Sequence, residues 1–173
     1  MAAGAYEIQS RRIVIATGVH TPVPDISGLS DVQYYTNQTI FDLTKKPEHL
    51  LVLGGGPVGV ELAQAFARLG VNVTIFEKRK LLSNFSREQV EILRVSLVED
   101  GVSLKEDTCV NNISKVGGKL VVQLTNDDKI TGSHLLVATG KKPNLQNLNL
   151  QAADISYSDI GIETDQYLSL IHI

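Results

Sequence analysis

The chain has 173 residues, a net charge of −3 and a pI of about 5.8, so no electrostatic argument favours nucleic acid or an anionic membrane surface as its partner. Apolar residues make up 43% and charged residues 20%, an ordinary globular mix, and the length suits one domain, or one domain plus a fragment of a neighbour. No run of 18 apolar residues and no apolar secretory core is present, so the expected location is cytoplasmic, without a membrane span.

The sequence predicts no metal site and no disulfide chemistry. Its one cysteine, Cys109, cannot form an internal disulfide or a two-cysteine redox centre. The four histidines are scattered, and no two of them have a metal-ligand spacing. We expect the histidines at the surface or at strand ends, and Cys109 inside a buried strand.

The first part of the chain predicts strands and a connector. A short stretch at 5–10 (AYEIQS) and a buried strand at 11–18 (RRIVIATG) are expected to form a strand pair. Residues 19–47 contain three prolines and a glycine, and predict a connector with little regular structure.

A strand–helix–strand unit follows the connector. HLLVLGGG predicts a buried strand that ends in glycines, and a run of good helix formers begins at Pro57. Gly70 is expected to end that helix. The β-branched stretch at 71–77 (VNVTIFE) predicts the next strand.

A second helix is predicted after Ser86, which forms a capping-box pattern with Gln89. Gly101 is expected to end it. The predicted apolar face of this helix consists of Val90, Leu93 and Leu97.

The pattern changes after the second helix. Residues 102–130 alternate apolar and polar side chains, and Gly117–Gly118 predicts a tight hairpin turn between two strands. HLLVATG at 134–140 then predicts a last apolar strand. The predicted fold class is α/β, a Rossmann-like βαβ parallel sheet with an inserted antiparallel β-meander.

The motif that indicates chemistry is G-x-G-x-x-G at Gly54, Gly56 and Gly59. The first glycine permits a sharp strand-to-helix turn, the second lets a pyrophosphate approach the backbone, and the third allows close packing of helix and strand. Pro57 and Val58 lie in the first helical turn, whose free N–H groups favour anions. The alternatives are an unrelated tight turn or a methyltransferase loop that binds S-adenosylmethionine.

An acidic residue, Glu77, closes the next strand 23 residues after Gly54. A carboxylate at this spacing can accept hydrogen bonds from the adenosine ribose hydroxyls, which favours NAD over NADP. The alternative is a solvated charge at a strand end. Lys78 and Arg79 follow directly, and Arg79 could hold a 2′-phosphate, so NADP remains an alternative cofactor.

Five segments together resemble the FAD-dependent pyridine nucleotide–disulfide oxidoreductases, whose familiar members include lipoamide dehydrogenase, glutathione reductase and mercuric reductase. These segments are IVIATG, PDISGL, LVLGGGPVGVELA, IFEKR and LLVATGKKPN. Their order covers roughly residues 6–168. The resemblance implies an NAD(P)-binding domain at 46–147, preceded at 1–45 by a remnant of the FAD-domain strand and connector.

The resemblance also implies that 148–173 begins the return of the chain to the FAD domain, with a non-native tail after Leu168. It places Glu61 near the nicotinamide and flavin, and Thr139 and Gly140 near the dinucleotide. Lys141 stands where the family has an arginine, which keeps the charge but loses the planar fork. We expect no catalytic group in this fragment, because the FAD-binding glycine motif, the CxxxxC disulfide and the C-terminal histidine–glutamate pair of the family are absent from the sequence.

The sequence therefore predicts the NAD(P)H-binding domain of a flavin-dependent disulfide oxidoreductase, which positions the nicotinamide for hydride transfer to the flavin. The implied cofactors are NAD, or NADP, and FAD in the intact enzyme only. The implied partners are the missing FAD and dimerisation domains of a homodimeric parent, and the isolated chain is expected to be inactive. A stand-alone dinucleotide-sensing module and a methyl-transfer protein are the alternatives.

Overall fold

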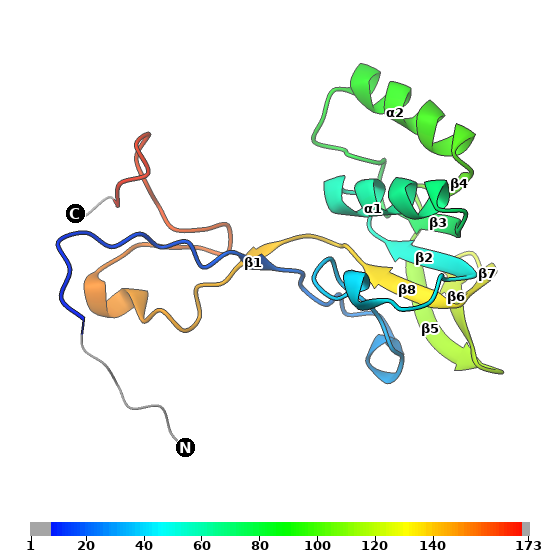
Figure 1. Ribbon diagram of the computed structural model, residues 1–173, viewed down its shortest axis with the longest axis horizontal. Helices are drawn as coiled ribbons and strands as arrows, with labels where there is room; N and C mark the ends of the chain where they lie inside the picture. The colour runs from blue at the N-terminus through cyan, green and yellow to red at the C-terminus, as the bar shows by residue number, and fades with distance from the viewer. Residues whose placement is uncertain (1–7, 171–173) are drawn as a thin grey trace. The chain divides into compact units, whose positions relative to one another are not determined.

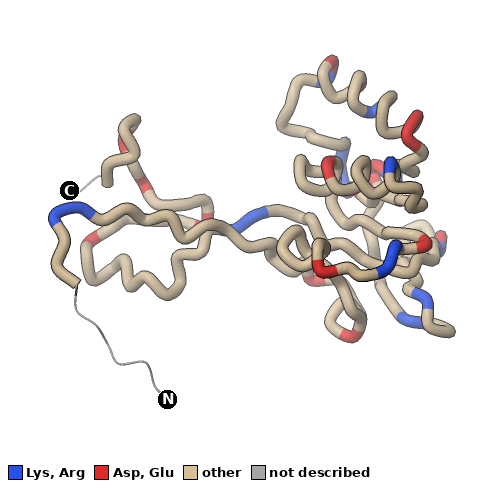
Figure 2. The backbone as a smooth tube through the Cα atoms, in the orientation of Figure 1, with Lys and Arg blue, Asp and Glu red and all other residues tan. Residues whose placement is uncertain are grey.

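The computed structural model describes residues 8–170 (Figure 1). One compact unit comprises residues 21–141, and a second is formed by the flanking stretches before residue 21 and after residue 141. Basic and acidic residues are interspersed along the described chain (Figure 2). Among the described helices, none combines the length and the apolar character needed to cross a bilayer.

A four-stranded parallel sheet forms the centre of the unit 21–141. Its strand order is β4-β3-β2-β8, and each neighbouring pair is parallel. The strands are β2 His49–Leu53, β3 Asn72–Phe76, β4 Val102–Lys105 and β8 His134–Val137. Leu50, Leu51 and Val52 of β2 have no exposed surface, as expected for a strand covered on both faces.

Two helices cover one face of this sheet. Helix α1, Pro57–Arg68, and helix α2, Arg87–Glu99, lie on the same side in Figure 1. Pro57 occupies the first turn of α1 as predicted. Helix α2 begins directly after Ser86, but the Ser86 side chain makes no capping hydrogen bond. The predicted apolar face of α2 packs into the core with the residues Val90, Leu93 and Leu97.

An antiparallel meander covers the opposite face. It consists of β5 Val110–Val116, β6 Lys119–Leu124 and β7 Lys129–Gly132, in that order. Gly117 and Gly118 have φ angles of 58° and 83°, so the predicted two-residue hairpin turn is present. Alternate β2 residues divide between the two faces, with Leu50 in the helix-side core and Leu51 in the meander-side core. The predicted α/β fold with an inserted meander is confirmed.

The connector 21–45 packs against the central sheet. It contains two 3₁₀ turns, η1 Leu29–Asp31 and η2 Ile40–Asp42, and both Leu29 and Ile40 are 1% exposed. Tyr35 forms a parallel bridge with Leu136 of β8. This packing groups residues 21–45 with the central sheet, whereas the predicted boundaries assigned 1–45 to a remnant of the FAD domain.

Strand β4 differs from its prediction. It was expected to belong to the antiparallel stretch, but it forms the parallel edge of the central sheet beside β3. Its alternating burial reflects this edge position, because Val102 is buried while Ser103 and Lys105 are exposed. Cys109 also departs from its prediction. It lies half-buried in the loop before β5 and not inside a strand.

The buried strand predicted at 11–18 is wrong. Ile13 and Val14 are 81% and 87% exposed, and residues 11–18 belong to no strand. The nearest strand in the chain, β1 Val19–His20, forms a two-residue antiparallel ladder with β9, Lys142–Pro143. A buried strand needs a neighbour along each edge, and the described residues supply none for 11–18.

The strand predicted at 5–10 begins outside the described residues, and its described part is not a strand. Residues 148–170 contain η3, Leu150–Ala153, and two isolated bridges. A non-native tail was predicted after Leu168, and its residues 171–173 lie outside the described residues.

Candidate functional site

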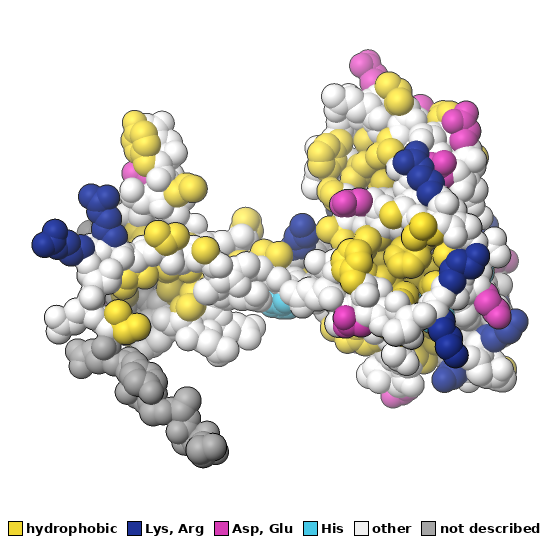
Figure 3. All heavy atoms as spheres, viewed as in Figure 1, with side chains coloured by type: hydrophobic (Ala, Val, Ile, Leu, Met, Phe, Trp, Pro, Cys, Tyr) yellow, Lys and Arg dark blue, Asp and Glu magenta, His cyan; other side chains and the backbone are white. Residues whose placement is uncertain are grey.

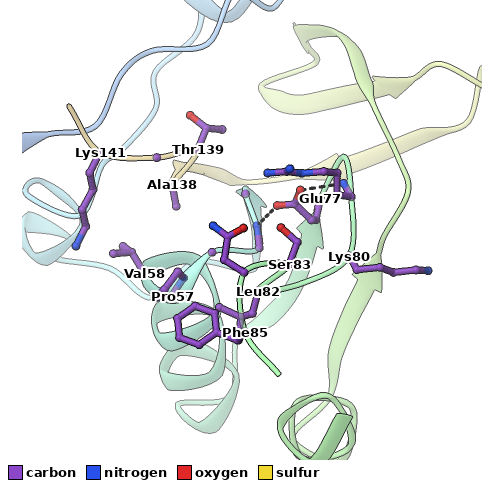
Figure 4. A pocket seen from close by; sticks show the side chains of 16 residues that line it. Pro57, Val58, Glu77, Lys80, Leu82, Ser83, Phe85, Ala138, Thr139 and Lys141 are labelled. Carbon is purple, nitrogen blue, oxygen red and sulfur yellow. Dashed lines mark hydrogen bonds between the residues drawn. The ribbon is translucent and has the colours of Figure 1, made fainter. Parts of the chain in front are cut away.

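A cleft of about 390 Å³ lies at the carboxyl ends of β2, β3 and β8 (Figure 4). This edge is where open parallel sheets bind their ligands. Three loops supply its lining: the turn from β2 into α1, the loop after β3, and the segment after β8. The lining residues lie within 54–58, 77–85 and 138–141.

The glycine-rich turn forms the floor of the cleft. Gly54 has a φ of 105°, and a Cβ atom there would lie 2.5 Å from the carbonyl oxygen of Ala138. A Cβ atom at Gly59 would collide with the backbone carbonyl oxygen of Gly54. The helix, the turn and the end of β8 therefore approach one another at backbone-to-backbone distance, which only glycine permits.

Gly56 differs from the other two glycines of the motif. It precedes α1 directly, and nothing lies within 4 Å of the position that a Cβ atom would take. Among residues 8–170, no side chain makes a capping hydrogen bond to the start of α1, and Pro57, in its first turn, has no N–H to donate. The Gly56 side of the turn is therefore open to a ligand, and the first-turn amides and the helix dipole favour an anion there.

Glu77 follows β3 and lies directly beside the glycine turn. Its Oε2 accepts a hydrogen bond of 2.7 Å from the Gly55 amide, and its Oε1 accepts one of 2.9 Å from the Arg79 amide (Figure 4). These two bonds fix the carboxylate at the mouth of the turn. Each carboxylate oxygen retains a further lone pair with which to accept a hydroxyl.

The basic residues after β3 have different surroundings. Arg79 and Lys80 line the cleft, while Lys78 lines a neighbouring hollow beside Cys109. Lys80 forms an ion pair with Asp107, whose hydrogen bond and charge raise the pKa of Lys80. Among the described residues, neither Lys78 nor Arg79 forms an ion pair, and of these two only Arg79 lines the cleft.

The segment after β8 supplies the third side. Ala138 is buried against the glycine turn, whereas Thr139, Gly140 and Lys141 are exposed along the cleft. The Thr139 hydroxyl donates to the carbonyl oxygen of Pro22 at 3.2 Å, which ties this segment to the connector.

The structure gathers most of the residues predicted from the sequence. The predicted residues that line the cleft are Gly54, Gly56, Pro57, Val58, Glu77, Arg79, Thr139 and Gly140. Gly59 lies behind the turn. Glu61 is exposed on α1 and lines a separate apolar groove between α1 and α2. Figure 3 shows hydrophobic side chains gathered over these two helices. Its predicted role near the nicotinamide remains a prediction.

Several lining residues were not among the predicted site residues. They are Gly55, Lys80, Leu82, Ser83, Asn84, Phe85, Ala138 and Lys141. Most of them belong to the loop after β3, whose only signal in the sequence is its position behind Glu77. Gly55 is different, because it is the middle one of three consecutive glycines and the G-x-G-x-x-G pattern does not require a glycine at that position.

The parallel sheet, the glycine turn and the helices on one face define a Rossmann-like α/β domain. A family model described as "Pyridine nucleotide-disulphide oxidoreductase" matches residues 2–172. The chain belongs to this family of oxidoreductases, and its resemblance to the FAD-dependent members is confirmed.

Individual relatives agree with this assignment. The chain is 36% identical to a mercuric reductase of Streptomyces lividans over 172 residues, which cover 95% of this chain and 36% of that protein. It is 33% identical to a mercuric reductase of Shigella flexneri, over 94% of this chain and 30% of that protein.

Among solved structures, the HOCl-induced flavoprotein disulfide reductase RclA of Escherichia coli superposes with a TM-score of 0.81 at 30% identity, over 88% of this chain and 36% of that chain. The chain thus spans about a third of the length of these relatives.

Proposed function

We propose that residues 46–147 bind NAD(P)H and position its nicotinamide for hydride transfer to a flavin in the complete oxidoreductase. The observation that carries this proposal is the pairing of an open, uncapped helix start at Gly56 with a fixed carboxylate, Glu77, in one cleft. An anion-binding turn and a sugar-binding acid at this separation in the sequence match the two halves of an adenosine diphosphate.

The residues present fit such a cofactor. The space beside Gly56 and the amides of Val58 and Gly59 would receive the pyrophosphate. The free lone pairs of Glu77 would accept the adenosine ribose hydroxyls. When bound, NAD(P)H supplies the hydride, and the chain's own residues bind and orient it.

The cleft favours NADH over NADPH. A carboxylate fixed at the ribose position would repel a 2′-phosphate and leave it facing a negative charge. Arg79 is the residue that offers a compensating cation, since Lys80 is engaged by Asp107. NADPH binding is therefore the alternative, and it depends on the Arg79 guanidinium.

The intact enzyme would combine this domain with an FAD domain and a dimerisation domain. FAD would accept the hydride and pass the electrons on to a further acceptor. We propose that this enzyme is a cytoplasmic homodimer, and that the 173-residue chain alone does not oxidise NADH. Flavin-independent NADH oxidation by the purified chain would overturn the last point.

Calorimetric titration with NADH and with NADPH tests the binding role. For Glu77→Ala we expect an approximately tenfold weaker Kd for NADH, which corresponds to about 1.4 kcal/mol. Glu99→Ala, an exposed glutamate at the end of α2, is the matched control and should leave the Kd unchanged. An unchanged Kd in Glu77→Ala would remove the ribose role, and no binding of either cofactor by the wild-type chain would overturn the proposed function.

A stand-alone nucleotide sensor and a methyl-transfer protein remain the competing functions. The family match to an oxidoreductase argues against both. A thermal-shift panel separates the methyltransferase, which would respond to S-adenosylmethionine and not to NADH. A sensor would bind NADH but would not pass electrons to a flavin domain supplied as part of the longer protein.

A further inference from the structure

The loop 78–86, which we call the outer loop, forms a wall of the cleft beside the glycine turn. It is braced by the residues that follow β4. The Asp107 amide donates to the carbonyl oxygen of Arg79 at 3.1 Å, and the Thr108 amide donates to that of Glu77 at 3.0 Å. The start of the outer loop therefore continues the pairing of β3 with β4 beyond the sheet.

Glu106 makes the main side-chain contacts in this brace. Its Oε1 accepts a 2.9 Å hydrogen bond from the Leu81 amide in the outer loop. Its Oε2 accepts bonds from Nε and Nη2 of Arg94 on α2, the first at 2.8 Å. The Glu106 side chain is 8% exposed and that of Arg94 is 38% exposed, so the carboxylate is the more shielded partner of this ion pair. One carboxylate thus joins β4, the outer loop and α2.

Leu81 connects Glu106 with the floor of the cleft. Its side chain is 2% exposed, and it lies so close to Gly55 that a Cβ atom there would collide with Cδ2 of Leu81. The Leu82 amide donates to the Gly55 carbonyl oxygen at 3.0 Å. The Gly55 amide in turn donates to Glu77. A continuous chain of contacts therefore connects Glu106 to the proposed ribose-binding carboxylate.

The electrostatics of Glu106 agree with a clamped, ionised side chain. Burial acts to raise its pKa, but the hydrogen bond from the Leu81 amide and the contact with Arg94 outweigh it, so the pKa lies below the usual range of a glutamate. A neutral amide at this position would leave the buried side of Arg94 without its counter-charge.

We propose that Glu106 is a positioning residue for the dinucleotide: it lies outside the cleft, yet it holds the outer loop so that Leu81, Gly55 and Glu77 are arranged for binding before the ligand arrives. This inference rests on the proposed function and deepens it. A preformed wall lowers the ordering cost of binding, so its loss weakens affinity while the fold persists.

The test compares Glu106→Gln with Asp100→Asn in the full chain. Asp100 pairs with Arg68 at 2.9 Å and links the end of α2 to α1, but neither residue lines the cleft, so this variant is the matched control. Calorimetry with NADH and with ADP-ribose is run at two temperatures below the melting transition of every variant. We expect Glu106→Gln to weaken the Kd of both ligands about five- to tenfold at both temperatures. Asp100→Asn should change neither Kd by more than about twofold.

The use of two ligands and two temperatures separates positioning from general destabilisation. A loss of affinity caused by partial unfolding disappears at the lower temperature. A loss of affinity caused by a misplaced outer loop persists there. An equal loss for ADP-ribose and NADH localises the effect to the adenosine half, where Glu77 lies.

Each outcome decides one claim. If the wild-type chain binds neither ligand, the proposed function fails. If the wild type binds and Glu106→Gln binds within twofold of it, or Asp100→Asn loses as much, the positioning role is overturned. Should Glu106→Gln not fold, Arg94→Lys retains the charge but loses the two-pronged contact. We then expect a two- to fivefold loss, and an unchanged Kd would overturn the inference.

Discussion

The floor and the outer wall of the cleft are built in different ways. The floor, at 54–59, depends on backbone atoms in direct contact, so that a single methyl group at Gly59 has no space. The wall, at 78–86, is mostly exposed and is held by hydrogen bonds, among them those of Glu106, whose largely buried carboxylate follows β4. The comparison implies that a side chain added at Gly54 or Gly59 damages the fold, whereas a change that reaches the wall weakens binding while the fold persists.

The largest expected effect is that of Gly59→Ala. Alanine normally stabilises a helix relative to glycine, by about 1 kcal/mol. Here the added Cβ would collide with the Gly54 carbonyl oxygen, and neither backbone can move without separating α1 from β2. We expect a loss of about 3 kcal/mol or more in the free energy of unfolding, measured by urea denaturation. A stabilised Gly59→Ala variant would mean that the helix and the turn are not in close contact.

Gly56→Val sharpens the comparison within the floor itself. The position is open and its φ of −76° suits any residue, so the free energy of unfolding should change by less than about 1 kcal/mol. The new side chain would fill the space proposed for the pyrophosphate, and the NADH Kd should weaken at least tenfold in the same calorimetric assay. Full affinity in this variant would place the phosphates elsewhere.

Glu106 gives the wall a characteristic dependence on pH. Its folded pKa is lowered, so its contribution to stability is present above the pKa of an unfolded glutamate, about 4.3, and is lost as the pH falls through the lower folded value. Wild type should therefore be more stable than Glu106→Gln at pH 7, and the difference should shrink below about pH 4. Urea denaturation at both pH values measures it, and a difference independent of pH would show that the charge of Glu106 contributes nothing.

The smallest effect is expected at His134, at the amino end of β8. Burial lowers its pKa, and its ring stacks on that of Tyr35 at a centroid distance of 5.8 Å. The unfolded chain takes up this proton near pH 6.5, so stability should fall slightly as the pH drops from 7.5 towards the lower folded value.

His134→Gln should flatten that part of the pH profile, measured by thermal unfolding. The NADH affinity should not change, because this residue lies away from the cleft. A profile identical to wild type would show that His134 titrates alike in the folded and unfolded chains.

The sequence predicted the floor well because its signals are local. Gly54, Gly56 and Gly59 lie within six residues, and the strand and helix that they join are specified by their own composition. The wall could not be predicted in this way. The contact between Glu106 and Leu81 spans 25 residues, and it depends on β4 lying parallel to β3.

The misassigned strands share a physical cause. The alternation in β4 indicates one exposed face, which an edge strand of a parallel sheet and an antiparallel strand have in common. The apolar run at 13–16 indicates burial but not what would cover it, and no described strand pairs with it. Patterns along the chain report exposure, whereas pairing depends on residues distant in sequence.

The most direct test of the account is to follow the backbone amide signals of the ¹⁵N-labelled chain by NMR during titration with NADH. We predict that the largest shifts fall on Gly55, Gly56 and Val58 at the helix start and on Arg79 beside Glu77, and that they saturate together. Shifts confined to other surfaces of the molecule, or no shifts at millimolar NADH, would contradict the claim that this cleft binds the dinucleotide.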